Sequence, residues 1–236
     1  MEKYFVKLCD RTICAVIHKT ALHPRACVVT CHGLFSSKDS NKFITIAEQF
    51  SAADIMVIRF DFSGCGESSG DISETTVTRR LEELETVISF FKGRGDINRE
   101  IFLLGSSLGG YVAALYAASH AVAGLSLWAT PFDLLDISQR IPENEIGKLK
   151  QDFFYDARRW HFAECLGRLS RVQIIHGTHD TIVPAAHAKE IYGRVNHPKE
   201  LIFLPSADHS FICDYHRQEA VTRSLAWFLH FLTLYF

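Results

Sequence analysis

The chain has 236 residues, of which 47% are hydrophobic and 22% are charged, and its formal net charge at pH 7 is −2. This length and composition are typical of one large globular domain, so we predict that residues 1–236 form a single domain. The balanced charge argues against the broad basic surface that nucleic-acid binding needs, and nothing in the composition requires a membrane-facing surface.

The chain ends and the cysteines indicate the cellular compartment. The N-terminal segment MEKYFVKLCD lacks the basic region and the long apolar run of a secretory signal. The seven cysteines are odd in number and irregularly spaced, which is typical of reduced thiols rather than of a disulfide framework. The apolar C-terminal segment AWFLHFLTLYF is too short to span a bilayer and is predicted to be a helix that faces the core. We therefore expect a cytoplasmic protein without a membrane span.

The first hundred residues alternate predicted strands with predicted helices. The strands are predicted over residues 4–9, 12–18, 26–31 and 55–60, of which the first two form a hairpin and the third is a continuous apolar run. The helices are predicted over residues 42–53 and 74–92. The charged residues of the second helix are expected to form its solvated face: Arg79, Arg80, Glu82, Glu83 and Glu85.

Residues 100–119, EIFLLGSSLGGYVAALYAAS, form the motif around which we expect the chain to be organised. An apolar strand ends in Gly105-Ser106-Ser107-Leu108-Gly109, and a helical segment follows at once. Because the strand and the helix begin almost on top of one another, a Cβ atom at Gly105 or Gly109 would collide with the returning backbone. The turn lifts the Ser107 hydroxyl above the sheet edge. It also leaves the Leu108 N–H without an intrahelical partner, where it can stabilise negative charge.

The second half of the chain resumes the alternation after one interruption. Strands are predicted over residues 121–129, 172–176 and 201–204, and a helix from about residue 215. The interruption is an insertion at about residues 131–170, which we predict to be a cap or lid. Most of its aromatic residues are expected to pack onto the body and some to face the cleft: Phe132, Phe153, Phe154, Tyr155, Trp160 and Phe162.

Several polar residues come directly after predicted strands. The repeated alternation of apolar strands and helices predicts a mostly parallel sheet with helices on both faces. Ligands bind such sheets beyond the carboxyl ends of the strands. The polar residues that follow the strands should therefore meet at one edge: His32, Asp61, Ser107, Asp180 and His209.

Three of these residues carry the side chains that nucleophilic catalysis needs. A serine hydroxyl is a weak nucleophile until a base takes its proton, and the base works best when a carboxylate holds its tautomer. The order Ser107, Asp180, His209 supplies all three groups.

Short motifs of one enzyme superfamily are spread over essentially the full length of the chain. They are residues 32–34 (HGL), 61–68 (DFSGCGES), 105–109 (GSSLG), 176–184 (HGTHDTIVP) and 208–211 (DHSF). Together they make the chain resemble the α/β-hydrolases, in particular the small esterase-like and serine aminopeptidase-like members with a short cap. In that family these motifs are the oxyanion loop, a glycine-rich turn, the nucleophile elbow, the acid loop and the base loop.

This resemblance implies an α/β-hydrolase fold and a serine hydrolase that needs neither cofactor nor metal. Ser107 would be the nucleophile, His209 the general base and then acid, and Asp180 the residue that orients it. The backbone N–H groups of Leu34 and Leu108 would form the oxyanion hole. We expect cleavage of small-molecule carboxylic esters, with small to medium acyl or aryl groups, through an acyl-enzyme.

Neighbouring residues offer alternative assignments. Asp133 or Asp136, after a predicted strand, is an alternative for the acid. His179 adjoins the predicted acid, so its ring cannot reach between that carboxylate and the serine, and Asp208 points the wrong way to orient the base. The spacing His176-x-x-His179 also suggests a metal, but no zinc-type cluster accompanies it.

Three further residues near this edge are expected to have structural roles. His32 should support the oxyanion loop, Asp61 should stabilise its own turn, and Cys65 should be an ordinary thiol.

Two other functions remain open. Cleavage of thioesters, amides or peptides uses the same groups, because the choice of leaving group depends on the pocket. A non-catalytic binding protein would keep the fold as a ligand cage, but we would expect it to lack one of the three catalytic side chains, and none is missing. No feature of the sequence specifies an oligomeric state.

Overall fold

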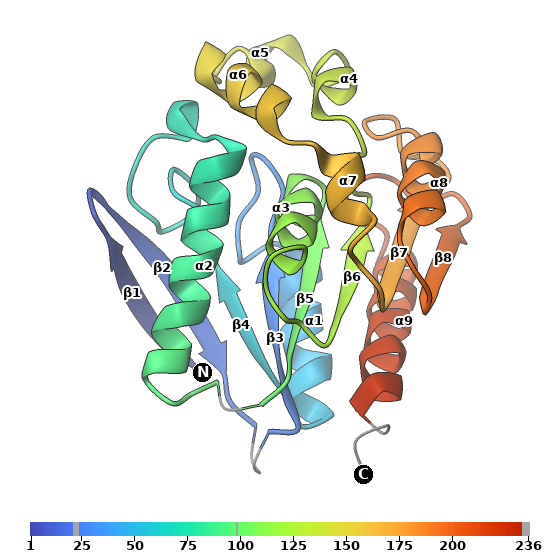
Figure 1. The fold of residues 1–236 in the computed structure, drawn as a ribbon. Helices are drawn as coiled ribbons and strands as arrows, with labels where there is room; N and C mark the ends of the chain where they lie inside the picture. Colours follow the sequence, from blue (N-terminus) through green and yellow to red (C-terminus); the bar gives the residue numbers. More distant parts are fainter. Residues whose placement is uncertain (21–23, 98, 233–236) are drawn as a thin grey trace.

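The computed structural model describes residues 1–20, 24–97 and 99–232, which contain one eight-stranded sheet (Figure 1). The strands are β1 (Glu2–Leu8), β2 (Arg11–His18), β3 (Ala26–Cys31), β4 (Ile55–Phe60), β5 (Ile101–Ser106), β6 (Gly124–Trp128), β7 (Val172–Gly177) and β8 (Lys199–Leu204). Their order across the sheet is β1-β2-β4-β3-β5-β6-β7-β8. β2 pairs antiparallel with β1 and β4, and the other pairs are parallel.

Helices cover both faces of the sheet and lie over one of its ends. They are α1 (Asn41–Ala52), α2 (Val77–Gly93), α3 (Leu108–Ala117), α4 (Leu134–Ser138), α5 (Glu143–Ile146), α6 (Gln151–Arg159), α7 (Phe162–Leu166), α8 (Ala185–Arg194) and α9 (Asp214–Leu232). Figure 1 shows α2, α3 and α8 on one face and α1 and α9 on the other. The predicted mostly parallel sheet with helices on both faces is confirmed.

The apolar runs of the sequence are the central strands. Every residue of β3, β4, β5, β6 and β7 is buried. Successive side chains of a strand point to opposite faces, so Val28 packs with Phe43 and Phe228 under α1 and α9, whereas Val29 packs with the α2 and α3 side. Two apolar cores, one on each face, hold the sheet in place.

Local capping explains where α2 begins. The charge pattern predicted a helix from about Glu74, but residues Ile72–Glu74 form a separate 3-10 turn and α2 begins at Val77. Thr76 is its N-cap, because the Thr76 hydroxyl accepts a hydrogen bond from the Arg79 N–H at 3.0 Å.

The insertion between β6 and β7 forms the helices α4 to α7, of which α4, α5 and α6 lie above the carboxyl ends of the strands in Figure 1. Apolar side chains of the insertion join the core, and polar contacts also attach it to the body. The Thr78 N–H donates to Asp156 Oδ2 at 2.8 Å, which ties α6 to the first turn of α2. His187 Nε2 of α8 lies 3.0 Å from Asp136 Oδ2 of α4.

The C-terminal helix packs on the α1 face. Phe228, Phe231 and Leu232 of α9 are buried, as the apolar pattern predicted. Residues 233–236, the end of that pattern, lie outside the described part. No helix in the described ranges combines the length and the apolar character needed to cross a bilayer.

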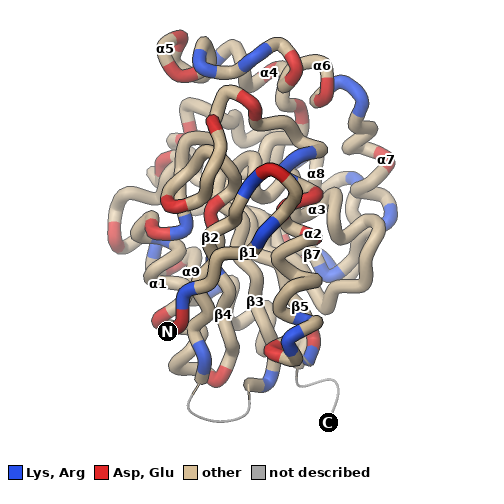
Figure 2. Tube along the Cα trace, turned by 90° about the vertical axis from the view of Figure 1, so that its left-hand side faces the viewer, with Lys and Arg blue, Asp and Glu red and all other residues tan. Residues whose placement is uncertain are grey.

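Charged residues of both signs are interspersed along the chain trace in Figure 2. The prediction that the charged residues of α2 face solvent is wrong for Arg80 and Glu83, which are fully buried. Glu83 accepts hydrogen bonds from Arg11 Nε at 2.8 Å and from the Ser63 N–H at 3.0 Å. The helical period placed these residues next to exposed ones, but the strand and loops that cover α2 decide what reaches solvent.

We predict that Glu83→Ala destabilises the fold by about 3 kcal/mol, because it leaves the buried Arg11 guanidinium without its buried carboxylate. Glu82→Ala is the matched control. Glu82 also pairs with Arg11, at 3.3 Å, but its side chain is 58% exposed, so its loss should cost about 1 kcal/mol or less. Urea unfolding of both variants measures the difference, and equal losses would contradict the buried role of Glu83.

Candidate active site

Ser107 lies at the turn between β5 and α3, with a φ of 56° and a ψ of −128°. A left-handed φ is unfavourable for a residue with a Cβ atom, so the surrounding structure must hold it. The Ser107 N–H donates to Trp128 O at 2.8 Å, and the Ser107 carbonyl accepts from Gly110 N at 2.9 Å. The turn is thereby tied to β6 and to the first turn of α3.

The glycines around this turn are required by close contacts. A Cβ atom at Gly105 would lie 2.5 Å from Gly109 O, and one at Gly109 would lie 2.1 Å from Cys31 O. The predicted steric need for glycine at both positions is confirmed. Gly110 has the same need, which the sequence did not reveal, because a Cβ there would lie 2.0 Å from a threonine hydroxyl oxygen.

His209 and Asp180, on the loops after β8 and β7, are hydrogen-bonded to each other. His209 Nδ1 lies 2.8 Å from Asp180 Oδ2, and the carboxylate is fully buried. The other oxygen, Oδ1, accepts from the N–H groups of Ile182 and Val183 at 2.9 and 2.7 Å. Because an ionised carboxylate only accepts, the Nδ1 of His209 is the donor, and Nε2 of the neutral ring is free to accept.

The two loops that carry these residues are also joined through their backbones. The His179 N–H donates to Ala207 O at 3.0 Å, and the Ser206 N–H donates to Thr178 Oγ1 at 2.9 Å. These bonds fix the separation of the two loops, and with it the position of the His209 ring.

His32 supports the loop that follows β3, as predicted. Its ring is buried, with Nδ1 donating to Gly33 O at 2.7 Å and Nε2 accepting from the Phe62 N–H at 2.9 Å. Burial and the nearby Arg80 guanidinium lower the pKa of His32 to about 3. The ring is therefore neutral, and its bond to Gly33 O holds that glycine in place. Gly33 lies close to Ser107, since a Cβ added at Gly33 would be 3.1 Å from the Ser107 Cβ.

The buried guanidinium of Arg80 supports the same loop from α2. Its Nη1 donates to His32 O and Gly33 O at 3.4 and 3.3 Å, and its Nε donates to Thr75 Oγ1 at 2.9 Å. It lies 4.5 Å from the centre of the Phe62 ring, a cation–π distance. The Leu34 amide follows directly after two carbonyls that are held in this way.

Asp61 stabilises its own turn, also as predicted. Its carboxylate accepts from the Glu67 N–H at 2.9 Å and from the Lys38 N–H at 2.7 Å, and the buried Lys38 ammonium lies 2.9 Å from Oδ2. A Cβ at Gly66 would lie 2.2 Å from the same carboxylate. The glycine-rich turn therefore packs around a structural ion pair.

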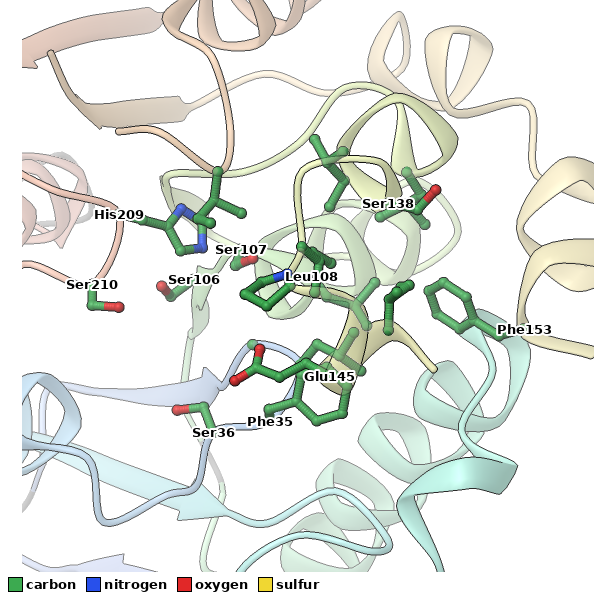
Figure 3. Close-up of a pocket in the computed structure, with 18 of the residues that line it drawn as sticks. Phe35, Ser36, Ser106, Ser107, Leu108, Ser138, Glu145, Phe153, His209 and Ser210 are labelled. Atoms are coloured by element: carbon green, nitrogen blue, oxygen red, sulfur yellow. The ribbon is translucent and has the colours of Figure 1, made fainter. Parts of the chain in front are cut away.

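A cavity of about 420 Å³ opens above Ser107. Its lining includes Ser107 and Leu108 of the turn before α3, Leu34 of the loop after β3 and His209 of the loop after β8. Figure 3 shows the His209 ring directed toward Ser107. Ser107, Asp180 and His209 are thus brought together, and the two predicted oxyanion residues lie beside them.

The insertion supplies the apolar side of this cavity, mostly with aliphatic residues. The contributing side chains are Leu134, Ile137, Ile141, Ile146 and Phe153. Among the aromatic residues singled out in the sequence, Phe153 faces the cavity, Phe162 stacks on Tyr111 with ring centres 3.9 Å apart, and Tyr155 is exposed.

The alternative residues have other partners. Asp133 caps α4 by accepting from the Leu135 N–H at 2.8 Å, and Asp136 contacts His187. Asp208 accepts from the N–H of the residue two positions on, at 2.7 Å, and therefore stabilises its own loop. Among the residues that the structure describes, there is no group of three His, Cys, Asp or Glu side chains placed to hold a metal ion.

A family model described as serine aminopeptidase, S33, matches residues 22–151, which is more than half of the chain. The chain belongs to this family. The chain also shares the α/β-hydrolase fold with solved structures. The structure of Est1E from Butyrivibrio proteoclasticus with bound ferulic acid has a TM-score of 0.87 at 17% identity and covers 98% of this chain and 99% of that one. At this identity the likeness shows the fold alone.

Two curated relatives of this S33 member match parts of their sequences. The uncharacterized protein YfhR of Salmonella typhimurium is 29% identical over 170 residues, which are 66% of this chain and 55% of that protein. The mitochondrial palmitoyl-protein thioesterase ABHD10 of Bos taurus is 25% identical over 214 residues, 77% of this chain and 66% of that protein. The match to YfhR thus spans just over half of that relative's length.

Two charged residues that line the cavity above Ser107 were not predicted from the sequence. Lys42 of α1 and Glu145 of α5 both line it. Lys42 lies on a helix with an ordinary amphipathic pattern, so its register gives no sign that the ammonium reaches the serine turn. Glu145 lies in a short helix of the insertion, where no periodicity indicates which side faces inward.

We predict that the His32 ring of this S33 member does not titrate between pH 8 and 5, because its folded pKa is about 3. NMR of the imidazole nitrogens should show a proton on Nδ1 throughout, with His32→Gln used to assign the signals. The unfolded chain takes up a proton near pH 6.5 that the folded protein does not, so this residue contributes a loss of stability as the pH falls below about 6.5. A ring that titrates near 6.5 would contradict the buried, neutral state.

Proposed function

We propose that this protein is a serine hydrolase that cleaves carboxylic esters through an acyl-enzyme, with Ser107, His209 and Asp180 as its catalytic residues. The observation that carries the proposal is the 2.8 Å hydrogen bond between His209 Nδ1 and Asp180 Oδ2 beside the strained turn at Ser107. Membership of a hydrolase family supports it.

The acylation step uses the free nitrogen of the histidine. Ser107 Oγ attacks the carbonyl carbon of the ester, and His209 Nε2 takes the hydroxyl proton. The carbonyl oxygen becomes an oxyanion, which the N–H groups of Leu34 and Leu108 would stabilise. The C–O bond to the alcohol then breaks, and His209 returns the proton to the departing alcohol.

Deacylation repeats the same steps with water. His209 takes a proton from a water molecule, whose oxygen attacks the acyl-enzyme carbonyl. The ester bond to Ser107 breaks, the serine oxygen regains a proton from His209, and the free acid leaves. No step needs a cofactor.

The buried carboxylate of Asp180 orients the base and stabilises the imidazolium that forms. Its Oδ1 is occupied by two backbone N–H groups, so Oδ2 is held in place for His209. A fixed acceptor at Nδ1 keeps Nε2 available for the serine proton.

The apolar side of the cavity supports an acyl group without charge. Apolar side chains of the insertion line a space of about 420 Å³, which is large enough for small to medium acyl or aryl groups. The ferulic acid in the Est1E structure is an aromatic acid, which supports the inclusion of aryl groups. We propose small-molecule esters as substrates and a cytoplasmic location, in agreement with the seven free thiols.

Thioester or amide cleavage is the second candidate. The likeness to a palmitoyl-protein thioesterase favours the thioester, and the description of the family as serine aminopeptidases favours the amide. Both reactions would use the same three side chains, so they differ from the first proposal in the leaving group.

We predict that Ser107→Ala lowers kcat for p-nitrophenyl esters by up to about 10⁶ and abolishes labelling by a fluorophosphonate probe. Ser106→Ala, which removes the neighbouring hydroxyl, is the matched control and should keep the labelling. Equal labelling of the wild type and Ser107→Ala would contradict the proposed nucleophile. Faster turnover of aminoacyl-p-nitroanilides or thioesters than of esters by the wild type would favour the second candidate.

We predict that Phe153→Ala shifts the preferred acyl length of p-nitrophenyl esters upward, because it enlarges the apolar side of the cavity. The ratio of kcat/KM for octanoate over butyrate should rise about tenfold. Phe154→Ala is the control, since the Phe154 ring packs edge-on against Phe153 with ring centres 5.4 Å apart but does not line the cavity. A flat chain-length profile in the wild type would count against an apolar acyl pocket.

A further inference from the structure

The cavity above Ser107 has a polar wall opposite the apolar side. We use this name for the residues Ser36, Lys42, Ser106, His209 and Ser210, all of which line the cavity. Figure 3 shows Ser36, Ser106, His209 and Ser210 on one side of Ser107 and Phe153 on the other. A substrate whose carbonyl lies at Ser107 therefore meets a different environment on each side.

Lys42 supplies the positive charge of the polar wall. Its ammonium donates to Ser106 Oγ at 2.8 Å, next to the proposed nucleophile. An ammonium has three N–H donors, and among the described residues Lys42 has a hydrogen bond to Ser106 but none to a carboxylate. Burial lowers the pKa of Lys42 to about 8, against the opposing pull of Asp208 and Asp180. At neutral pH the buried ammonium thus carries a charge that two carboxylates stabilise from a distance and to which no carboxylate is hydrogen-bonded among the described residues.

The chemistry of the proposed reaction assigns the polar wall to the leaving group. The leaving alcohol must receive its proton from His209, so it has to lie on the His209 side of the carbonyl. Lys42 lies on that same side, since its ammonium binds Ser106. Its charge is also stabilised by Asp208, which precedes His209 in the chain, and by Asp180, which is hydrogen-bonded to His209. The acyl group takes the other side, where the apolar residues of the insertion lie.

The carboxylate of Glu145 also faces the cavity near the polar wall. Glu145 of α5 lines the cavity, and in Figure 3 its carboxylate points toward the side of Ser36. Glu145 would oppose an anion near Lys42, so removing its charge should strengthen the effect of the lysine. This gives a second residue with which to test the sign of the interaction.

We propose that Lys42 is a specificity residue that selects esters whose leaving group carries a negative charge, such as a carboxylate. The substrate class is then an apolar acyl group joined to an acidic alcohol or phenol. This inference rests on the proposed ester hydrolysis at Ser107.

The test compares two butyrate esters that differ in the charge of the leaving group. The charged ester is the butyrate of 4-hydroxybenzoate, and the neutral one is the butyrate of 4-hydroxybenzamide. The quantity measured is the ratio of kcat/KM for the charged ester over the neutral ester. Because this ratio is compared between variants, the intrinsic reactivity of each ester cancels.

Lys42→Met should lower this ratio about 10- to 100-fold, as expected for the loss of a hydrogen-bonded charge pair. Lys42→Arg should largely restore the ratio, and Glu145→Gln should raise it. Lys92→Met, which removes the same charge from an exposed position of α2, should leave the ratio unchanged. In the wild type the ratio should fall as the pH rises through about 8, because the ammonium then loses its proton.

A ratio that stays within about twofold in Lys42→Met, while both esters are still cleaved, would overturn the role of Lys42. Fluorophosphonate labelling of Lys42→Met shows that its site is folded, and Lys42→Arg keeps the test valid if the Met variant does not fold. If the wild type cleaves neither ester, the proposed esterase itself is wrong, and the role of Lys42 falls with it.

Discussion

The left-handed backbone at Ser107 is the constraint on which the rest of the site depends. A φ of 56° at a residue with a side chain is held by bonds to β6 and α3 and by the absence of Cβ atoms at the neighbouring glycines. The conformation places Ser107 at the N-terminus of α3, where the first backbone N–H groups have no intrahelical partner. The proposed nucleophile and the proposed Leu108 donor both depend on this turn.

The loops around the serine turn are held by two kinds of interaction. On one side, neutral His32 and buried Arg80 bind the Gly33 carbonyl of the loop after β3, and His32 also accepts from the Phe62 N–H of the turn after β4. On the other side, the loops that carry Asp180 and His209 are hydrogen-bonded to each other. Both sets of bonds are satisfied within the protein, which is how a site keeps its geometry before a substrate arrives.

Much of this arrangement could be predicted from the sequence, because short-range steric rules govern it. The glycines at 105 and 109, the apolar central strands and the grouping of polar residues at the strand ends follow from local sterics and from the rules of parallel sheets. The burial of Arg80 and Glu83 could not be predicted in this way, since exposure depends on segments distant in sequence. Lys42 was missed for the same reason, as it contacts a residue 64 positions away.

The helices between β6 and β7 form most of the apolar side of the cavity, whereas the residues proposed for catalysis, Ser107, Asp180, His209, Leu34 and Leu108, come from other segments. Under the proposed function, the residues that would recognise the acyl group are thus encoded in one contiguous stretch of the gene, apart from the positions proposed for bond cleavage. During evolution, that stretch can accumulate substitutions, lengthen or be exchanged while the chemistry is retained. Under the proposed function, such changes would alter which acyl groups fit the cavity and leave the proposed catalytic residues in place.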